Sequence, residues 1–208
     1  MAAEPKQRRI ARWLPAILAG LWLVAAAMGQ RMLLNYDFAA AAPGTPPANW
    51  PSASKILRAP SLPSIVVVAH PQCPCSRATV EELARIMALL QNKVTATVVF
   101  VRPSGFSRDW ETTDLWRSAA RIPGVAVLDD LDGLEASRFG AFASGQTMLY
   151  DSAGDLRFSG GITPSRGHAG DSLGRNAILS VVNKENPVTS HTSVYGCSLH
   201  NPERAVRE

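Results

Sequence analysis

The sequence predicts an α/β domain in which a mixed β-sheet is flanked by helices, preceded by one N-terminal transmembrane helix. Between residues 64 and 128, apolar strand patterns alternate with helical patterns, an order typical of parallel strands joined by right-handed crossovers. Two further short strands flank a turn at residues 151–154, which indicates an antiparallel hairpin. An uncharged apolar segment near the N-terminus predicts the membrane helix.

The N-terminal segment at residues 13–29 contains no charged side chain. A membrane-spanning helix needs roughly 17–25 mostly apolar residues, and this segment reaches that length. The basic residues that precede it are Lys6, Arg8, Arg9 and Arg12. Because positive charge favours the cytoplasmic side, we expect a single-pass membrane protein with a cytoplasmic N-terminus. Its domain would lie in the periplasm or another extracytoplasmic space.

A cleaved signal peptide is the alternative interpretation of this segment. Small residues suitable for cleavage occur at residues 25–27 and 39–41. The apolar region of a signal peptide is typically about 7–15 residues long, which is shorter than this uncharged run. We therefore favour an uncleaved signal-anchor.

The chain divides by composition into parts of different character. We expect a cytoplasmic basic N-terminus at residues 1–12, a transmembrane signal-anchor at 13–29, a linker at 30–63, a folded domain at 64–183 and a C-terminal tail at 184–208. The linker contains an Ala/Pro/Gly-rich stretch without hydrophobic periodicity, a composition that favours extended or flexible chain. The tail is polar and carries the last cysteine, Cys197.

The folded domain is expected to follow the order β-α-β-α-β-α-β-β-α. The first strand, at residues 64–70, is an unbroken apolar run, as expected for a central strand covered on both faces. The next helix has Val80, Leu83 and Met87 on one apolar face and is expected to end near Asn92. Further strands are predicted at residues 94–102, 125–128, 147–150 and 156–159, and further helices at 108–121, 132–141 and 172–182.

Composition narrows the functional classes. The 208-residue chain has a formal net charge of +4, and much of the basic excess lies at the termini. The sequence has no basic stripe with interleaved aromatic residues, so nucleic-acid binding is not expected. Three cysteines are too few for a dense disulfide framework; they suggest one pair plus one thiol, or a three-thiol site.

Two of the cysteines, Cys73 and Cys75, lie in a Pro-rich turn between the first strand and the following helix. The thiolate is the reactive form of cysteine, and a helix N-terminus stabilises an anion. Arg77, and His70 if it is protonated, would favour the thiolate further. A Cys73–Cys75 disulfide would close a tight ring, and strained disulfides are easily reduced. The turn therefore predicts a reactive dithiol.

The motifs HPQCPCSRAT, FSGGITPSRGHAGD and VYGCSL resemble thioredoxin-like proteins, and together they are similar to the membrane-anchored RedB-type branch. The resemblance covers about residues 60–183. It implies a thioredoxin fold and a thiol-disulfide oxidoreductase or dithiol electron carrier, in which Cys73 attacks and Cys75 resolves. The implied partner is a protein thiol or disulfide, and no soluble cofactor is required.

Two positions depart from the thioredoxin pattern. The cysteines form Cys-x-Cys where the family has Cys-x-x-Cys. Either Cys73 is the nucleophile and one spacer residue is lost, or only Cys75 occupies a usual thiol position and Gln72 stands at the other. Gln146 stands where the family has a cis-proline. Because a cis peptide bond without proline costs about 2.5–4 kcal/mol, we expect a trans bond at Gln146. The backbone that faces the thiols would then differ from that of the family.

Cys197 lies beyond the last predicted helix. If the tail folds back over the turn, Cys197 is an auxiliary or resolving thiol. If the tail does not, Cys197 is a free surface thiol. The sequence leaves both interpretations open.

A copper-binding or copper-delivery protein of thioredoxin-like fold, or one for another soft metal such as zinc, is the alternative function. Thiolates and imidazoles suit Cu(I) and Zn²⁺, and the candidate ligands are Cys73, Cys75, Cys197, His70 and His200. His168, in a glycine-rich loop, is a further candidate. A third hypothesis is a domain that serves as an assembly partner in a membrane redox complex.

Overall fold

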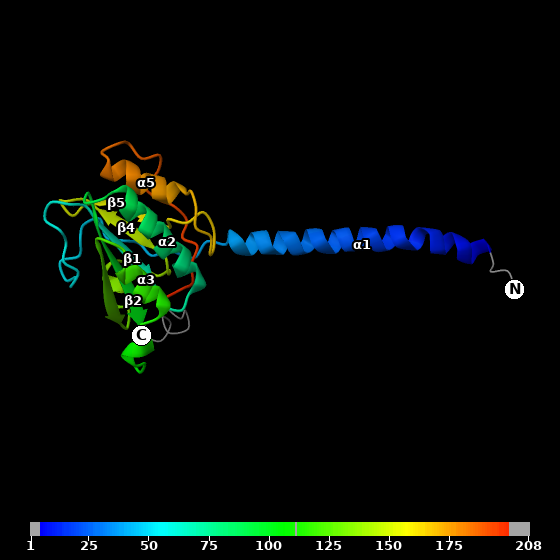
Figure 1. Cartoon of the computed structure of the whole chain (residues 1–208), viewed down its shortest axis with the longest axis horizontal. Coiled ribbons are helices and arrows are strands. Elements are labelled where there is room, and N and C mark those ends of the chain that lie inside the picture. Colours follow the sequence, from blue (N-terminus) through cyan, green and yellow to red (C-terminus); the bar gives the residue numbers. More distant parts are fainter. Residues whose placement is uncertain (1–4, 111, 200–208) are drawn as a thin grey trace. The chain divides into compact units, whose positions relative to one another are not determined.

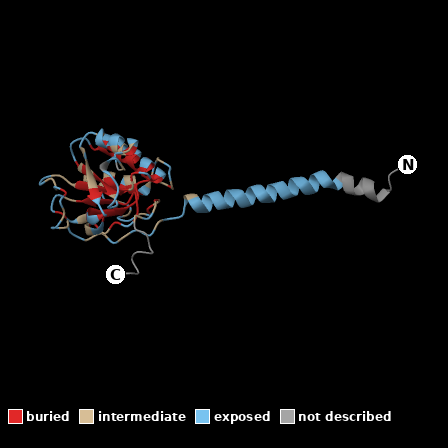
Figure 2. Cartoon of the chain, turned by 90° about the horizontal axis from the view of Figure 1, so that it is seen from below, coloured by how far each residue is buried: buried red, intermediate tan, exposed pale blue. Residues whose placement is uncertain are grey.

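The computed structural model describes residues 5–110 and 112–199, and the chain forms two compact units, Met1–Phe38 and Ala39–Glu208 (Figure 1). The first unit is the helix α1 (Pro5–Asp37). Within it, Trp13–Asp37 is a 25-residue segment with mean hydropathy 1.6, and its side chains are exposed along nearly the whole length (Figure 2). At about 1.5 Å per residue, this segment is long enough to cross the roughly 30 Å hydrocarbon core of a bilayer. The predicted apolar N-terminal helix is confirmed, and it continues to Asp37.

The second unit is built on a five-stranded mixed sheet with the order β3-β2-β1-β4-β5. The strands are β1 (Ser64–Ala69), β2 (Thr95–Arg102), β3 (Val125–Leu131), β4 (Thr147–Tyr150) and β5 (Leu156–Gly160). Strands β1, β2 and β3 are parallel, whereas β4 pairs antiparallel with both β1 and β5. Every residue of the central strand β1 is buried, which explains its unbroken apolar sequence.

Both faces of the sheet are covered. The helices are α2 (Pro74–Leu89), the 3₁₀ turn η1 (Arg108–Trp110), α3 (Asp114–Ala120), α4 (Leu134–Arg138) and α5 (Leu173–Val182). Alternate residues of β1 belong to two separate cores, because successive side chains of a strand point to opposite faces. Ile65 and Val67 pack with residues of α2, α3 and α5, while Val66 and Val68 pack with Phe139 and Tyr150.

Residues 39–63 lie against the domain without a helix or strand of their own. Trp50 packs edge-on against Phe139 and Tyr150, at ring-centroid distances of 5.0 and 5.3 Å. The Tyr150 hydroxyl donates to the carbonyl of Pro47 at 3.0 Å. These contacts complete the second core.

The segment predicted as one helix over residues 108–121 is divided into η1 and α3. Thr113 is the N-cap of α3: its hydroxyl accepts a hydrogen bond from the Trp116 N–H at 3.4 Å. The same hydroxyl donates to the carbonyl of Pro71 at 3.3 Å, which ties the start of α3 to the turn before α2. The third strand is also longer than predicted, because β3 stays paired with β2 as far as Leu131.

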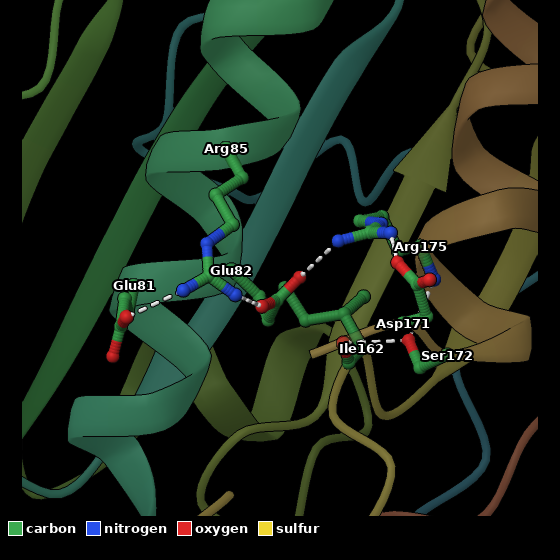
Figure 3. A network of polar contacts seen from close by, with 7 residues as sticks. All are labelled: Glu81, Glu82, Arg85, Ile162, Asp171, Ser172 and Arg175. Carbon is green, nitrogen blue, oxygen red and sulfur yellow. Dashed lines mark hydrogen bonds and ion pairs between the residues drawn. The ribbon is translucent and has the colours of Figure 1, made fainter. Parts of the chain in front are cut away.

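An ion-pair network centred on a buried carboxylate joins α2 to α5 (Figure 3). The Glu82 side chain is fully buried and pairs with Arg85 on its own helix and with Arg175 on α5, the latter at 3.2 Å. Arg175 also pairs with Asp171. Ser172 caps α5 and donates to the carbonyl of Ile162 at 2.8 Å. The network fixes the start of α5 against the helix that carries the cysteines.

Candidate functional site: a three-thiol cluster

The three cysteines converge at the end of the central strand. Cys73 is the N-cap of α2, Pro74 is its first residue, and Cys75 follows in the first turn. Cys197 arrives from the tail, and its Sγ lies 2.7 Å from the Sγ of Cys73. All three sulfur atoms lie within 4.8 Å of one another. Cys73 and Cys75 are buried, and Cys197 is half-buried.

Hydrogen bonds to Ser144 hold the cysteine turn in place. The hydroxyl of Ser144 accepts from the backbone N–H of His70 at 2.9 Å and shares a 2.6 Å hydrogen bond with the Ser76 hydroxyl. The N–H of Cys73 donates to the carbonyl of His70 at 3.1 Å. The turn is therefore fixed at both ends to a residue that sequence reasoning did not single out.

The tail pairs with the same segment by its backbone. The N–H of Ser144 donates to the carbonyl of Cys197 at 2.8 Å, and the N–H of Leu199 donates to the carbonyl of Phe142 at 2.9 Å. Ala143 and Ser198 form an antiparallel bridge between these bonds. A Cβ atom at Gly196 would lie 1.7 Å from the carbonyl oxygen of Ser144, so this close approach requires glycine. The tail does fold back over the turn, and Cys197 meets Cys73 there.

The surroundings of the three thiols shift their pKa values in different directions. Burial raises the pKa of Cys73, but hydrogen bonds from the Cys197 side chain and from the backbone N–H groups of Ser76, Cys75 and Cys197 outweigh it and leave the pKa below its usual value. Burial, and then the neighbouring Cys73, raise the pKa of Cys75. Burial, and then the hydrogen bond to Cys73, raise the pKa of Cys197 to about 12. The negative charge is therefore favoured on Cys73, with Cys197 as a protonated neighbour.

Arg166 is a second residue of the site that sequence reasoning missed. Its Nη1 donates to the carbonyl of Gly196 and its Nη2 to the carbonyl of Ala39, each at 3.0 Å. Its positive charge opposes the raised pKa values of both Cys75 and Cys197, and its side chain hydrogen-bonds to Cys75. Arg166 lies in the motif FSGGITPSRGHAGD, in which His168 was the predicted candidate ligand.

Two of the candidate histidines, His70 and His168, make their contacts outside the thiol cluster. The Nδ1 of His70 accepts from the N–H of Gln72 at 3.2 Å, and its ring packs edge-on against Trp110 at 5.2 Å. Burial lowers the pKa of His70, which favours the neutral imidazole. The Nδ1 of His168 lies 2.8 Å from the carbonyl of Arg166 within its own loop. His200, the remaining candidate ligand, lies outside the described residues.

Gln146 occupies the position expected for a cis-proline, and none of the described peptide bonds is cis, as predicted. Its carbonyl accepts from the N–H of Val68 on β1 at 3.0 Å. Its buried side-chain Oε1 accepts from the N–H groups of Gly44 and Phe142, at 3.2 and 3.3 Å. Gln146 thus fastens residues 39–63 and the Phe142 segment to the sheet.

The parallel strands β3-β2-β1, the antiparallel hairpin β4-β5 and a cysteine at the start of the helix after the central strand define a thioredoxin-like domain. The sequence matches no protein-family model and no curated protein.

Solved structures with a similar fold exist. A hypothetical protein from Sinorhizobium meliloti 1021 is 19% identical with a TM-score of 0.57, covering 78% of this chain and 96% of that one. An uncharacterized conserved protein from Geobacillus kaustophilus is 14% identical with a TM-score of 0.57, covering 79% and 94%. The exposed lipoprotein thioredoxin of Streptococcus pneumoniae strain TIGR4 is 16% identical with a TM-score of 0.42, covering 60% and 85%. At these identities, the likeness to the first two structures concerns the fold alone.

Proposed function

We propose that this chain is a membrane-anchored thiol–disulfide oxidoreductase in which Cys73 is the nucleophile and Cys197 the resolving thiol. One observation carries the proposal: the Sγ atoms of Cys73 and Cys197 lie 2.7 Å apart, with the pKa of Cys73 lowered and that of Cys197 raised. A thiolate beside a protonated thiol is the arrangement that a two-step exchange requires.

The exchange conserves atoms and electrons. The Cys73 thiolate attacks a disulfide of a partner protein; a Cys73–partner bond forms, the partner's S–S bond breaks, and the released partner thiolate takes up a proton. Cys197 then loses its proton and attacks the Cys73 sulfur, which forms Cys73–Cys197 and releases the partner's second thiol. The partner is reduced by two electrons and this chain is oxidised by two. The same steps run in reverse when a dithiol partner reduces the chain.

Cys75, the partner of Cys73 suggested by the Cys-x-Cys spacing, is less suited to the first resolving step. A bond between residues two apart closes a strained ring, whereas Cys197 comes from a separate segment without that constraint. We assign Cys75 a secondary role, as a thiol that competes with Cys197 for the Cys73 sulfur.

The location and the family branch belong to the same proposal. The apolar helix α1 would anchor the chain in a membrane, with the basic residues before it in the cytoplasm. The thiols would then act in the periplasm or another extracytoplasmic space, where disulfides persist. We further propose membership of the RedB-type branch of thioredoxin-like proteins.

Single-cysteine variants of the full-length chain in detergent test the assignment. Incubated with an oxidised model protein such as insulin, Cys197→Ser should accumulate a mixed disulfide at Cys73, because the resolving thiol is missing. Cys75→Ser should still turn over and should yield Cys73–Cys197 on peptide mapping. Accumulation in Cys75→Ser and turnover in Cys197→Ser would reverse the two roles. A wild-type chain that neither exchanges nor forms any of these bonds would overturn the proposal.

Soft-metal binding is the second candidate function, favoured by the three sulfur atoms within 4.8 Å of one another. With metal–sulfur bonds of about 2.3 Å, tetrahedral ligation places sulfur atoms about 3.8 Å apart. Cys73 and Cys197, at 2.7 Å, would have to separate by about an ångström to share an ion. Titration of the reduced chain with Cu(I) or Zn²⁺ separates the candidates: stoichiometric protection of three thiols without disulfide exchange would favour metal binding.

A further inference from the structure

We propose that Arg166 is a positioning residue that holds Cys197 beside Cys73. This inference rests on the exchange proposed above and assigns the group that governs it. Arg166 lies in the loop after β5, whereas Cys73 and Cys75 begin α2 and Cys197 lies in the tail. The guanidinium therefore connects parts of the chain that no helix or strand joins.

The geometry of the guanidinium carries the argument. One arm donates to the carbonyl of Gly196, the residue directly before Cys197, and the other to the carbonyl of Ala39, where the domain begins. The segment that begins at Ala39 also pairs directly with the tail, because the N–H of Ala41 donates to the carbonyl of Val194 at 2.8 Å. The tail is thus held both by the backbone of Phe142 and Ser144 and by the side chain of Arg166.

The chemistry of arginine suits this role. The planar fork places two donors at a fixed separation, which lets one side chain bridge two carbonyl groups, whereas lysine presents a single point charge. The guanidinium lies beside two thiols of the cluster, Cys75 and Cys197. A cation at this position keeps the tail in place and limits the rise in the pKa of Cys75 and Cys197.

The test compares wild type, Arg166→Gln and Arg166→Lys as full-length chains in detergent, equilibrated in glutathione buffers. Peptide mapping measures the fraction of Cys73–Cys197 bond. A hydrogen bond from a charged donor is worth roughly a factor of ten, so Arg166→Gln should lower the equilibrium constant for the bond about tenfold, or about 30 mV for a two-electron couple. Arg166→Lys, which keeps the charge and loses the fork, should fall between the two.

A second measurement reads the tail without redox chemistry. In the reduced proteins, amide hydrogen exchange over residues 194–199 should be faster in Arg166→Gln than in wild type. Arg157→Gln is the matched control, since Arg157 is 55% exposed on β5 and its contact with Asp151 is 3.9 Å long; it should match wild type in both measurements.

The outcomes separate the two proposals. If Arg166→Gln changes neither the amide hydrogen exchange of the tail nor the equilibrium constant for the Cys73–Cys197 bond, the role of Arg166 is overturned. The proposed thiol–disulfide exchange would still stand. Faster tail exchange in Arg166→Gln, together with no Cys73–Cys197 bond even in wild type, would support the positioning role and overturn the exchange function. If Arg166→Lys lowers the equilibrium constant as much as Arg166→Gln does, the two-donor geometry of the guanidinium is required and its charge alone is not enough.

Discussion

Replacement of Gly196 by alanine perturbs the tail at its tightest contact. The added Cβ would lie 1.7 Å from the carbonyl oxygen of Ser144 and 2.8 Å from its carbonyl carbon, where real Cβ contacts are at least 3.0 Å. Both neighbours are backbone atoms of the segment that also holds the cysteine turn, so they cannot move aside like the end of a flexible side chain. The tail must lift away from Ser144 instead.

The cost follows from the bonds that the lifted tail gives up. These are Ser144 N–H to the Cys197 carbonyl and Leu199 N–H to the Phe142 carbonyl, at 2.8 and 2.9 Å. A net contribution of about 1 kcal/mol for each gives about 2 kcal/mol in total. The ratio of docked tail, with Cys197 beside Cys73, to lifted tail should then fall roughly 30-fold.

The assay is the oxidation equilibrium of the full-length chain in glutathione buffers. Gly196→Ala should lower the equilibrium constant for Cys73–Cys197 roughly 30-fold and should expose Cys197 to alkylation in the reduced protein. Val188→Ala, at a tail side chain that is 92% exposed, is the control and should behave as wild type. If Gly196→Ala forms the bond as readily as wild type, the docked tail does not bring the two thiols together.

Three further predictions concern reactivity and stability. Because the pKa of Cys73 lies below its ordinary 9.0 and that of Cys197 is raised to about 12, the iodoacetamide reactivity of Cys73 should rise with a midpoint below pH 9, whereas Cys197 should stay protonated and unreactive to about pH 10. Gln146→Ala removes the acceptor for two backbone N–H groups and should lower the free energy of unfolding by about 2 kcal/mol in a urea titration. Glu82→Gln leaves the half-buried guanidinium of Arg175 without one of its partners and should cost about 3 kcal/mol by the same measurement.

Each of these three has a contradicting result. Equal midpoints for Cys73 and Cys197 would remove the proposed division between nucleophile and resolving thiol. An unfolding free energy of Gln146→Ala equal to that of wild type would mean that residues 39–63 do not depend on this side chain. For Glu82→Gln, loss of disulfide exchange at unchanged stability would mean that the ion pair acts on the thiols and not on the fold.

The sequence was most informative where one physical rule dominates. The unbroken apolar run predicted at residues 64–70 is typical of a strand covered on both faces, and Ser64–Ala69 is the central strand β1. The cysteine turn followed from the change from strand to helix periodicity around Pro74. These local signals were enough for the fold class.

The assembly of the site involves contacts that local patterns do not encode. Cys73 and Cys197 are 124 positions apart in the chain, and the tail is held by backbone hydrogen bonds, which place few demands on side-chain type. Arg166 also bonds to carbonyl groups, so no complementary residue in the sequence announces it. The division of the helix predicted over residues 108–121 depended on a bond from Thr113 to Pro71, which is likewise distant in sequence.

The separation of 124 positions between Cys73 and Cys197 has a consequence for the whole domain. A bond between them would close a loop that contains most of the sheet and helices α2 to α5, and in the chain-entropy model a loop of this size stabilises the folded state by about 5 kcal/mol. Oxidation would then stabilise the folded state as well as serve as a step in electron transfer. The oxidised chain should resist heat and proteases more strongly than the reduced chain. The redox state of the site would therefore set the stability of the whole domain.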